Sequence, residues 1–429
     1  MIESLDVILW DKKVGTLVAS RERHRNKACF YFDSDYVREG YDIAPLRASV
    51  KGAAAQRGLP VYPDEDRIFG GLPSFIADSL PDHWGNTVFN EWAKAHRIRV
   101  RDLSALDRLA YIGRRGMGAL EFVPPTAEEL ETPFKVEVAD LYQLARQAFE
   151  EAGRFNILMS GDLMVESLFK VGTSADGRRP KAVINVNFEE GQCYSGQVAT
   201  PYPGYTPMII KFDEHLKMPT TRIEYSYYLM AVDAGLQMMP CRLLKSGNAT
   251  HFLTERFDRR ENKKVHIQTL AAMNPSANSY ENLFDTACRI GVPPAELRQL
   301  FRAMVLNVLG GNVDDHNKNF SFLMDDDGRW HVAPAYDYTF SVDPDAPYYI
   351  NRHSMTVNNK TEDIDVEDLL NVAHKYGIKA AEPFIEKATG IVLRYSEYGR
   401  KAGVSEEWIK IIEKEISARV EGLNENRIK

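Results

Sequence analysis

Residues 312–320 read Asn312–Val313–Asp314–Asp315–His316–Asn317–Lys318–Asn319–Phe320 and place two carboxylates, an imidazole, an ammonium group and three amides within nine positions. The stretch follows an apolar segment with helical spacing, Leu297–Leu309, and precedes a strand-like segment, Phe320–Met324. Clusters of Asp and Asn are usually turns. Other parts of the chain must therefore indicate whether this cluster is a site.

The spacing of acid and amide inside this stretch is informative. An Asp followed five residues later by an Asn, as in Asp314 and Asn319, is typical of the catalytic loop of protein kinases. There the Asp accepts the proton of the substrate hydroxyl and the Asn binds Mg²⁺. Asp314 is therefore the candidate base, and the adjacent Asp315 leaves open that one acid is structural. Within the same nucleotide site we interpret His316 as a hydrogen-bonding residue and Lys318 as a contact to the γ-phosphate.

A hairpin is predicted directly after the loop. The segments Phe320–Met324 and Arg329–Ala333 flank an Asp-Gly turn, which is a strong hairpin signal. The hairpin would return Asp337 to the loop, beside Asn319. Carboxylate and amide oxygens are ligands that Mg²⁺ prefers, so both residues are candidate metal ligands. The alternative is that Asn319 caps a strand and Asp337 begins a turn, but their convergence favours a metal site.

The order of elements upstream is that of a kinase small lobe. It comprises a polar loop, a hairpin, a strand containing a lysine, a helix containing a glutamate, and two further strands. The ranges are Gly172–Lys181 for the loop, Ala182–Phe188 and Cys193–Val198 for the hairpin, Met208–Phe212, Arg222–Leu236, Cys241–Lys245 and His251–Phe257.

Several residues of this region are candidate nucleotide ligands. Lys211, in an apolar strand, would bind phosphates, or its ammonium group would reach water at a sheet edge. Glu224 would pair with Lys211 as in kinases, or it would complete a capping box with Thr221. Gly177 and Lys181 belong to the candidate phosphate loop.

The segment Glu255–Arg256–Phe257 follows the last strand of this series. A kinase hinge offers backbone N–H and C=O groups to adenine at this point. We therefore predict that these three residues contact the nucleotide.

Bulk properties restrict the class of protein. The chain has 429 residues, 44% of them hydrophobic, a net charge of −8 and four scattered cysteines without a zinc-binding spacing. This composition predicts a cytoplasmic globular protein with reduced thiols, no membrane span and no direct wrapping of nucleic acid.

The length favours two or three domains. A proline-bounded acidic segment at 124–133 predicts a linker. We expect an α+β chain with a mixed α/β N-terminal domain (1–124). A kinase-like small lobe (136–258) and a mostly helical C-terminal lobe (259–429) would follow. The glycine-rich basic loop Ile112–Gly118 is more typical of a tight turn than of a phosphate cradle.

Taken together, the chain resembles the HipA family of bacterial toxin kinases. The residues that carry the resemblance are Asp314–Phe320, Tyr336–Asp337, Glu255–Asp258, Ile210–Lys211 and Ser174–Lys181, with Leu72–Asp82 and Gly113–Gly118 in the N-terminal region.

The resemblance implies a protein serine/threonine kinase that uses ATP and Mg²⁺. It also implies a HipB-like helix-turn-helix antitoxin, operator DNA bound only through that complex, a role in persistence, and aminoacyl-tRNA synthetases as a substrate class. Ser174 matches the serine that the family autophosphorylates, and Thr173 is an adjacent hydroxyl. A phosphate there would add about −1.5 to −2 charges where ATP phosphates must lie.

Two other functions are considered. A metal-dependent nuclease would use Asp314, Asp315, His316 and Asp337 to hold two metals, but it leaves Lys211 unexplained. A non-catalytic regulatory module on a kinase fold would not need the lysine, both acids and the asparagine in one chain. The sequence does not identify the protein substrate.

Overall fold

The computed structural model describes residues 2–20, 27–64, 69–126, 134–150, 179–196, 203–214, 217–261, 263–347 and 350–425. Thr173, Ser174 and Gly177 of the predicted phosphate loop lie outside these ranges, as does most of the proposed linker. Those predictions therefore remain predictions.

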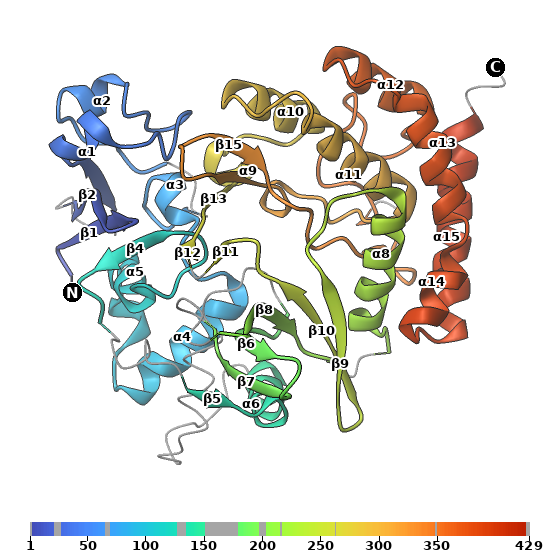
Figure 1. Cartoon of the computed structure of the whole chain (residues 1–429), viewed down its shortest axis with the longest axis horizontal. Helices are drawn as coiled ribbons and strands as arrows, with labels where there is room; N and C mark the ends of the chain where they lie inside the picture. The colour runs from blue at the N-terminus through green and yellow to red at the C-terminus, as the bar shows by residue number, and fades with distance from the viewer. Residues whose placement is uncertain are drawn as a thin grey trace.

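The N-terminal region is built on an antiparallel sheet of order β3-β2-β1-β4. The strands are β1 Ser4–Leu9, β2 Lys12–Ala19, β3 Ala28–Phe32 and β4 Leu120–Val123. Five short helices accompany the sheet (Figure 1): α1 Ser34–Glu39, α2 Ala53–Gln56, α3 Ser74–Ala77, α4 His83–Ala95 and α5 Ala105–Ile112. Polar caps define the helix starts: Asp82 caps α4, and Ser104 with Asp107 forms a capping box on α5.

A six-stranded sheet of order β5-β7-β6-β8-β10-β9 follows. Its strands are β5 Lys135–Val136, β6 Lys181–Asn187, β7 Gln192–Ser195, β8 Thr206–Lys211, β9 Cys241–Ser246 and β10 Ala249–Glu255, with α6 Val138–Glu150 and α8 Thr220–Ala234 alongside. These elements confirm the predicted hairpin, lysine strand, glutamate helix and final strand pair. Every residue of β6 is buried. Neighbouring residues of a strand, such as Ile184 and Asn185, point to opposite faces of the sheet, so both faces are covered at this strand.

The remainder is mostly helical, with a small sheet of order β13-β14-β15. Its strands are β13 His266–Thr269, β14 Ser321–Met324 and β15 Trp330–Val332; a two-stranded ribbon, β11 Arg259–Arg260 and β12 Lys263–Lys264, precedes them. The helices are α9 Leu270–Met273, α10 Tyr280–Arg289, α11 Leu297–Gly310, α12 Val366–Lys375, α13 Ala381–Val392, α14 Tyr395–Ala402 and α15 Glu406–Glu425. Asp325–Gly328 is the turn of the predicted β14–β15 hairpin, and Gly328 has a φ of +77°.

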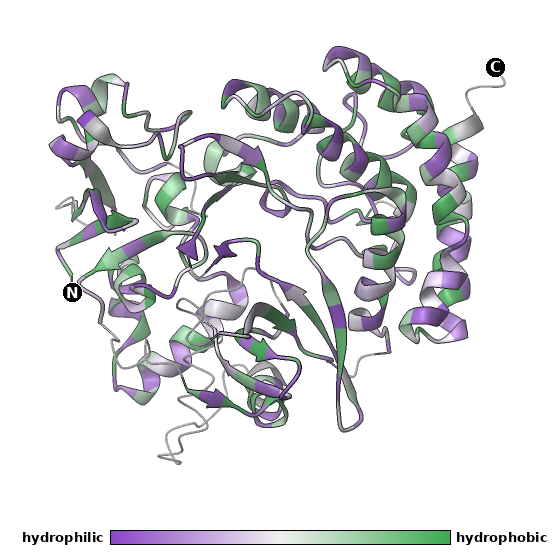
Figure 2. Cartoon of the chain, in the orientation of Figure 1, coloured by the Kyte–Doolittle hydropathy of each residue, from purple (hydrophilic) through white to green (hydrophobic). Residues whose placement is uncertain are grey.

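Hydropathy follows this architecture. Figure 2 shows apolar colours along β6 and β8 and alternating colours along the outer helices α12 to α15. None of the described helices combines the length and apolar character needed to cross a lipid bilayer.

The N-terminal region contacts both halves of the rest of the chain. Trp84 donates its indole N–H to the Lys181 carbonyl oxygen on β6, at 2.8 Å. On the other side, the Ser74 hydroxyl donates to the carbonyl oxygen of Ala272, also at 2.8 Å. The loop Ile112–Gly118 lies between these contacts, and its Gly118 N–H donates to Asp258 at 2.8 Å. This loop is therefore an anchored turn, as predicted.

Candidate active site

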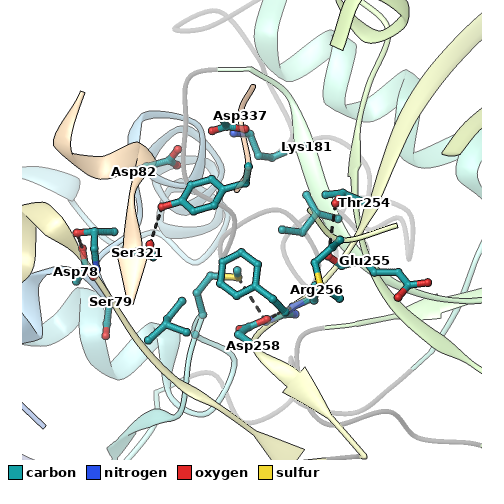
Figure 3. A pocket seen from close by; sticks show the side chains of 18 of the residues that line it. Asp78, Ser79, Asp82, Lys181, Thr254, Glu255, Arg256, Asp258, Ser321 and Asp337 are labelled. Atoms are coloured by element: carbon teal, nitrogen blue, oxygen red, sulfur yellow. Dashed lines mark hydrogen bonds and ion pairs between the residues drawn. The ribbon is translucent and has the colours of Figure 1, made fainter. Parts of the chain in front are cut away.

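A deep pocket lies where the six-stranded sheet, the β14–β15 hairpin and the N-terminal segment Phe75–Asp82 meet. It encloses about 1360 Å³, including the part open to solvent. Aliphatic and aromatic side chains such as Ile209, Phe252 and Tyr336 form most of its wall, and charged side chains lie at several points around it, among them Lys181 and Asp337 close together (Figure 3). This combination suits a ligand with a flat apolar part and an anionic part.

Lys211 lines the pocket and contacts two acids. Its ammonium group is 2.5 Å from Glu224 Oε1 and also pairs with Asp337 Oδ1. Burial alone would lower the pKa of Lys211, but the two carboxylates outweigh it and raise that pKa. Burial opposes the ionised form of Asp337, yet Lys211, assisted by Lys181, lowers the pKa of Asp337 to about 2. Lys211 and Asp337 are therefore both charged at neutral pH.

The position of Glu224 decides between its two predicted roles. Helix α8 begins at Thr220 with Pro219 as its N-cap, so Thr221 lies inside the helix. The Thr221 hydroxyl donates to the Thr250 carbonyl oxygen at 2.7 Å. The capping-box interpretation is therefore wrong, and Glu224 is the partner of Lys211.

Strand pairing explains why two lysines face the pocket. In the register of β6 and β8, Lys181 lies directly opposite Lys211, and residues opposite each other point to the same face of a sheet. Figure 3 shows Lys181 beside Asp337. Lys181 and Lys211 therefore both lie next to Asp337.

The Asp314–Asn319 loop closes on itself. The Asn319 side-chain amide donates to the Asp314 carbonyl oxygen at 2.7 Å, so the five-residue spacing corresponds to a hydrogen bond. The Asp314 carboxylate is 70% exposed, with His316 Nε2 at 3.9 Å. The backbone N–H of Lys318 donates to His316 Nδ1 at 3.3 Å, which is the hydrogen-bonding role expected of this histidine. The loop is thus held by its own hydrogen bonds and exposes the Asp314 carboxylate to solvent.

The second acid of the loop has a different environment. Asp315 is fully buried, and its carboxylate accepts hydrogen bonds from Tyr280 and His353. Of the two adjacent acids, Asp315 is the structural one.

Metal-ligand candidates can be tested against this geometry. The Asn319 amide nitrogen is used inside the loop, and among the described residues no group donates a hydrogen bond to its oxygen. Asp337 adopts a φ of +51°, a left-handed conformation that is uncommon outside glycine. An amide oxygen and an ionised carboxylate fit the hard oxygen donors that Mg²⁺ requires.

Two backbone N–H groups of the predicted hinge already donate hydrogen bonds within the protein. The N–H of Glu255 donates to the Pro240 carbonyl oxygen at 3.0 Å, and that of Arg256 to Pro207 at 2.9 Å. The Arg256 side chain is buried in a salt bridge with Asp258. These two N–H groups are therefore already used within the protein, which leaves the carbonyl groups of Glu255 and Arg256, and Phe257, for a nucleotide; that the three residues contact one remains a prediction. Phe257 lines the pocket, with its ring 5.6 Å from that of Tyr336.

Sequence reasoning missed the N-terminal wall of the pocket. Asp78, Ser79 and Pro81 line it, yet no spacing of charged or glycine residues marks them as part of a site. Asp78 accepts hydrogen bonds from the N–H and hydroxyl of Thr269. Only the resemblance of Leu72–Asp82 to a family motif could have drawn attention to this segment.

Comparison with known proteins defines the class. Residues 173–396 match the family model of the HipA-like C-terminal domain, and residues 5–123 match that of the HipA N-terminal domain. The chain therefore belongs to the HipA family.

Individual relatives agree with this assignment. The chain is 26% identical over 362 residues to "Putative kinase Y4mE" of Sinorhizobium fredii (strain NBRC 101917 / NGR234), covering 78% of this chain and 77% of that protein. Among solved structures, HipA of the Shewanella oneidensis MR-1 toxin–antitoxin complex with HipB and operator DNA superposes with a TM-score of 0.65 at 18% identity, covering 97% and 96% of the two chains. The fold is thus a mixed α/β N-terminal region followed by a kinase-like bilobal unit with a mostly helical C-terminal lobe.

A shorter match is to the proinflammatory kinase CtkA of Helicobacter pylori. Its TM-score is 0.36 at 16% identity, over 52% of this chain and 86% of that one.

Proposed function

We propose that this protein is an ATP- and Mg²⁺-dependent protein serine/threonine kinase of the HipA type. The observation that carries the proposal is Lys211, held between Glu224 and Asp337 in the wall of a mostly apolar pocket. Phosphoryl transfer requires mainly positioning and charge neutralisation. A buried cation fixed by two acids supplies both.

The proposed roles follow from where the side chains lie. Lys211 and Lys181 would bind the phosphates, and Lys318 and His316 would lie near the γ-phosphate. Asn319 and Asp337 would hold Mg²⁺, which neutralises phosphate charge when bound. The exposed Asp314 would orient the substrate hydroxyl and accept its proton. Phe257 and the carbonyl groups of Glu255 and Arg256 would contact the adenine.

Domain boundaries at 124, 136 and 258 are part of the proposal. They are supported by the end of β4 at Val123 and by the six-stranded sheet, which begins at Lys135 and ends at Glu255.

Regulation would follow the family pattern. We propose that Ser174, or the adjacent Thr173, is autophosphorylated and that this blocks ATP. A HipB-like helix-turn-helix protein would neutralise the kinase and link it to operator DNA, as HipB and operator DNA accompany HipA in the Shewanella structure. An aminoacyl-tRNA synthetase is the proposed class of substrate. Mass spectrometry after incubation with Mg-ATP should find phosphate on the Gly172–Lys181 peptide; its absence would remove this autoregulation and leave the kinase proposal intact.

The decisive experiment compares phosphoryl transfer with nucleic-acid cleavage. Wild type should transfer ³²P from γ-labelled ATP to protein, whereas Asp314→Asn and Asp337→Ala should not. Full activity in Asp337→Ala would refute the site as described. Cleavage of DNA or RNA lost in Asp314→Asn would favour the nuclease. Against a nuclease stands Asp315, whose carboxylate is buried and occupied by protein donors, so it cannot join a two-metal site.

A further inference from the structure

The catalytic loop is supported from behind by a buried carboxylate. Asp315 Oδ2 accepts from the Tyr280 hydroxyl at 2.7 Å and from His353 Nδ1 at 2.9 Å, while Oδ1 accepts from the Ser354 N–H at 2.8 Å. The side chains of Asp315 and His353 are 0% and 2% exposed. A buried carboxyl group left without its hydrogen-bond donors costs free energy, so this arrangement is stable only while the donors stay in position.

These donors come from elements that are distant in the sequence. Tyr280 is the first residue of α10, and His353 and Ser354 lie in the segment before α12. Ser354 holds the loop backbone as well, because its N–H and its hydroxyl both lie 3.1 Å from the Val313 carbonyl oxygen. Asp315 therefore fixes the loop to two separate parts of the helical lobe.

The support extends to the C-terminal helix. Since His353 Nδ1 donates to Asp315, its Nε2 is the acceptor, and Arg419 Nη1 of α15 lies 3.5 Å from it. Glu415 orients this arginine, with 2.9 Å between Arg419 Nε and Glu415 Oε1. A Cβ atom on Gly311 would lie 3.2 Å from Arg419 Nε, so α15 also packs against the start of the loop.

The other side of the loop is held by hydroxyl and amide groups. The N–H groups of Val313 and Asp314 donate to the Ser341 hydroxyl at 2.7 and 3.0 Å, and Ser341 donates to Asn312. Asn312 in turn donates to Asn307 of α11. The position of Asp314 is thus fixed by the hydrogen bond of its own N–H to Ser341 and by the buried hydrogen bonds of the adjacent Asp315.

We propose that His353 and Tyr280 are positioning residues for phosphoryl transfer, acting through Asp315 on Asp314 and Asn319, and that the His353–Arg419 contact couples α15 to the loop. This inference rests on the proposed kinase function. Adjacent Cα atoms are about 3.8 Å apart, so a displaced Asp315 displaces Asp314 with it. A misplacement of about 1 Å can cost about 100-fold in rate.

The kinetic test uses replacements of graded severity. His353→Leu removes the donor to Asp315, whereas His353→Asn keeps it, because the asparagine amide nitrogen can occupy the place of Nδ1. Per folded molecule, His353→Leu should lower kcat by about 10- to 100-fold without changing the KM for ATP, and His353→Asn should restore most of the loss. Tyr280→Phe should lie between them. Tyr376→Phe is the matched control, because its hydroxyl donates to Glu281 and Asp285 of the same helix α10.

A second readout separates this proposal from the kinase proposal. Amide hydrogen exchange across 307–325 should become faster in His353→Leu and Tyr280→Phe and stay unchanged in Tyr376→Phe, whether or not the protein transfers phosphate. If wild type proves inactive but His353→Leu and Tyr280→Phe still exchange faster than it, the role of Asp315 in holding the loop stands and the kinase proposal is rejected.

The opposite pattern overturns the proposal. If wild type is active and His353→Leu retains its kcat and its exchange pattern, the loop does not depend on this support. Equal losses in His353→Leu and His353→Asn would also overturn it, because the donor to Asp315 would then be irrelevant. Loss of melting temperature in His353→Leu with unchanged kcat per folded molecule would leave only a structural role.

Discussion

Replacement of Lys211 by methionine should destabilise the fold and abolish phosphoryl transfer for different reasons. The substitution leaves Glu224 and Asp337 without their shared cation. The Glu224 side chain is only 6% exposed, whereas that of Asp337 is 32% exposed. Removing one partner of a buried ion pair costs about 3–5 kcal/mol, and most of this loss should come from Glu224 because water screens Asp337.

The double variant Lys211→Met/Glu224→Gln separates the two effects. Without the buried negative charge, the free energy of unfolding should return to within about 1–2 kcal/mol of wild type. Phosphoryl transfer should stay at least about 100-fold below wild type in both variants, because no cation then faces the phosphates. Stability would therefore be restored while activity would not.

Urea unfolding followed by tryptophan fluorescence and ³²P transfer from ATP measure the two quantities. Lys360→Met is a matched control: Lys360 also contacts two acids, Asp365 and Asp368, but it is 40% exposed. Its loss should cost at most about 1 kcal/mol and leave activity intact. A double variant no more stable than Lys211→Met, or one with restored transfer, would refute this account of the site.

Two further predictions concern β13, which contacts the N-terminal region. Burial lowers the pKa of His266 to about 4, although its Nε2 donates to the Ile43 carbonyl oxygen. Between pH 6.5 and 4 the unfolded state binds more protons, so wild type should lose about 3 kcal/mol relative to His266→Gln as the pH falls from 7 to 4; a difference between the two urea midpoints that is the same at pH 7 and at pH 4 would contradict this. Gly118→Ala should destabilise by about 1–3 kcal/mol, because Gly118 has a φ of +72° and a Cβ would lie 2.9 Å from Ile267 Cγ1; Gly191→Ala, with a φ of +65° and open space around it, isolates the steric part in thermal unfolding.

Local sequence patterns predicted the elements and the centre of the site. Alternation and turn signals gave the β9–β10 and β14–β15 hairpins, and the spacing from Asp314 to Asn319 corresponds to a hydrogen bond within one short loop. The role of Glu224 could be decided only once the start of the helix was known, because the capping box with Thr221 and the ion pair with Lys211 both use this glutamate. Local spacing was sufficient wherever both partners lie in one element or in adjacent ones.

Contacts between distant segments were beyond such patterns. The internal use of the Glu255 and Arg256 N–H groups was not foreseen, because their acceptors lie in other segments: Pro207 belongs to β8 and Pro240 directly precedes β9. The N-terminal wall was missed for the same reason: Asp78 meets Thr269 across a separation of 191 residues. No spacing rule reports which surface of one domain covers another.

The buried cluster of Arg256, Asp258 and Arg259 shows what the contact with the N-terminal region does for the pocket. Burial opposes ionisation of Asp258, but Arg256 and Arg259 outweigh it and hold the pKa of this carboxyl well below its usual range. The same carboxylate accepts the Gly118 N–H, and Arg259 donates to the Gly116 and Gly118 carbonyl oxygens. A buried carboxylate between two arginines cannot release one partner without a large cost in free energy. Because Arg256 follows the last strand of the small lobe, the N-terminal region fixes the backbone on which the pocket's Phe257 wall is built.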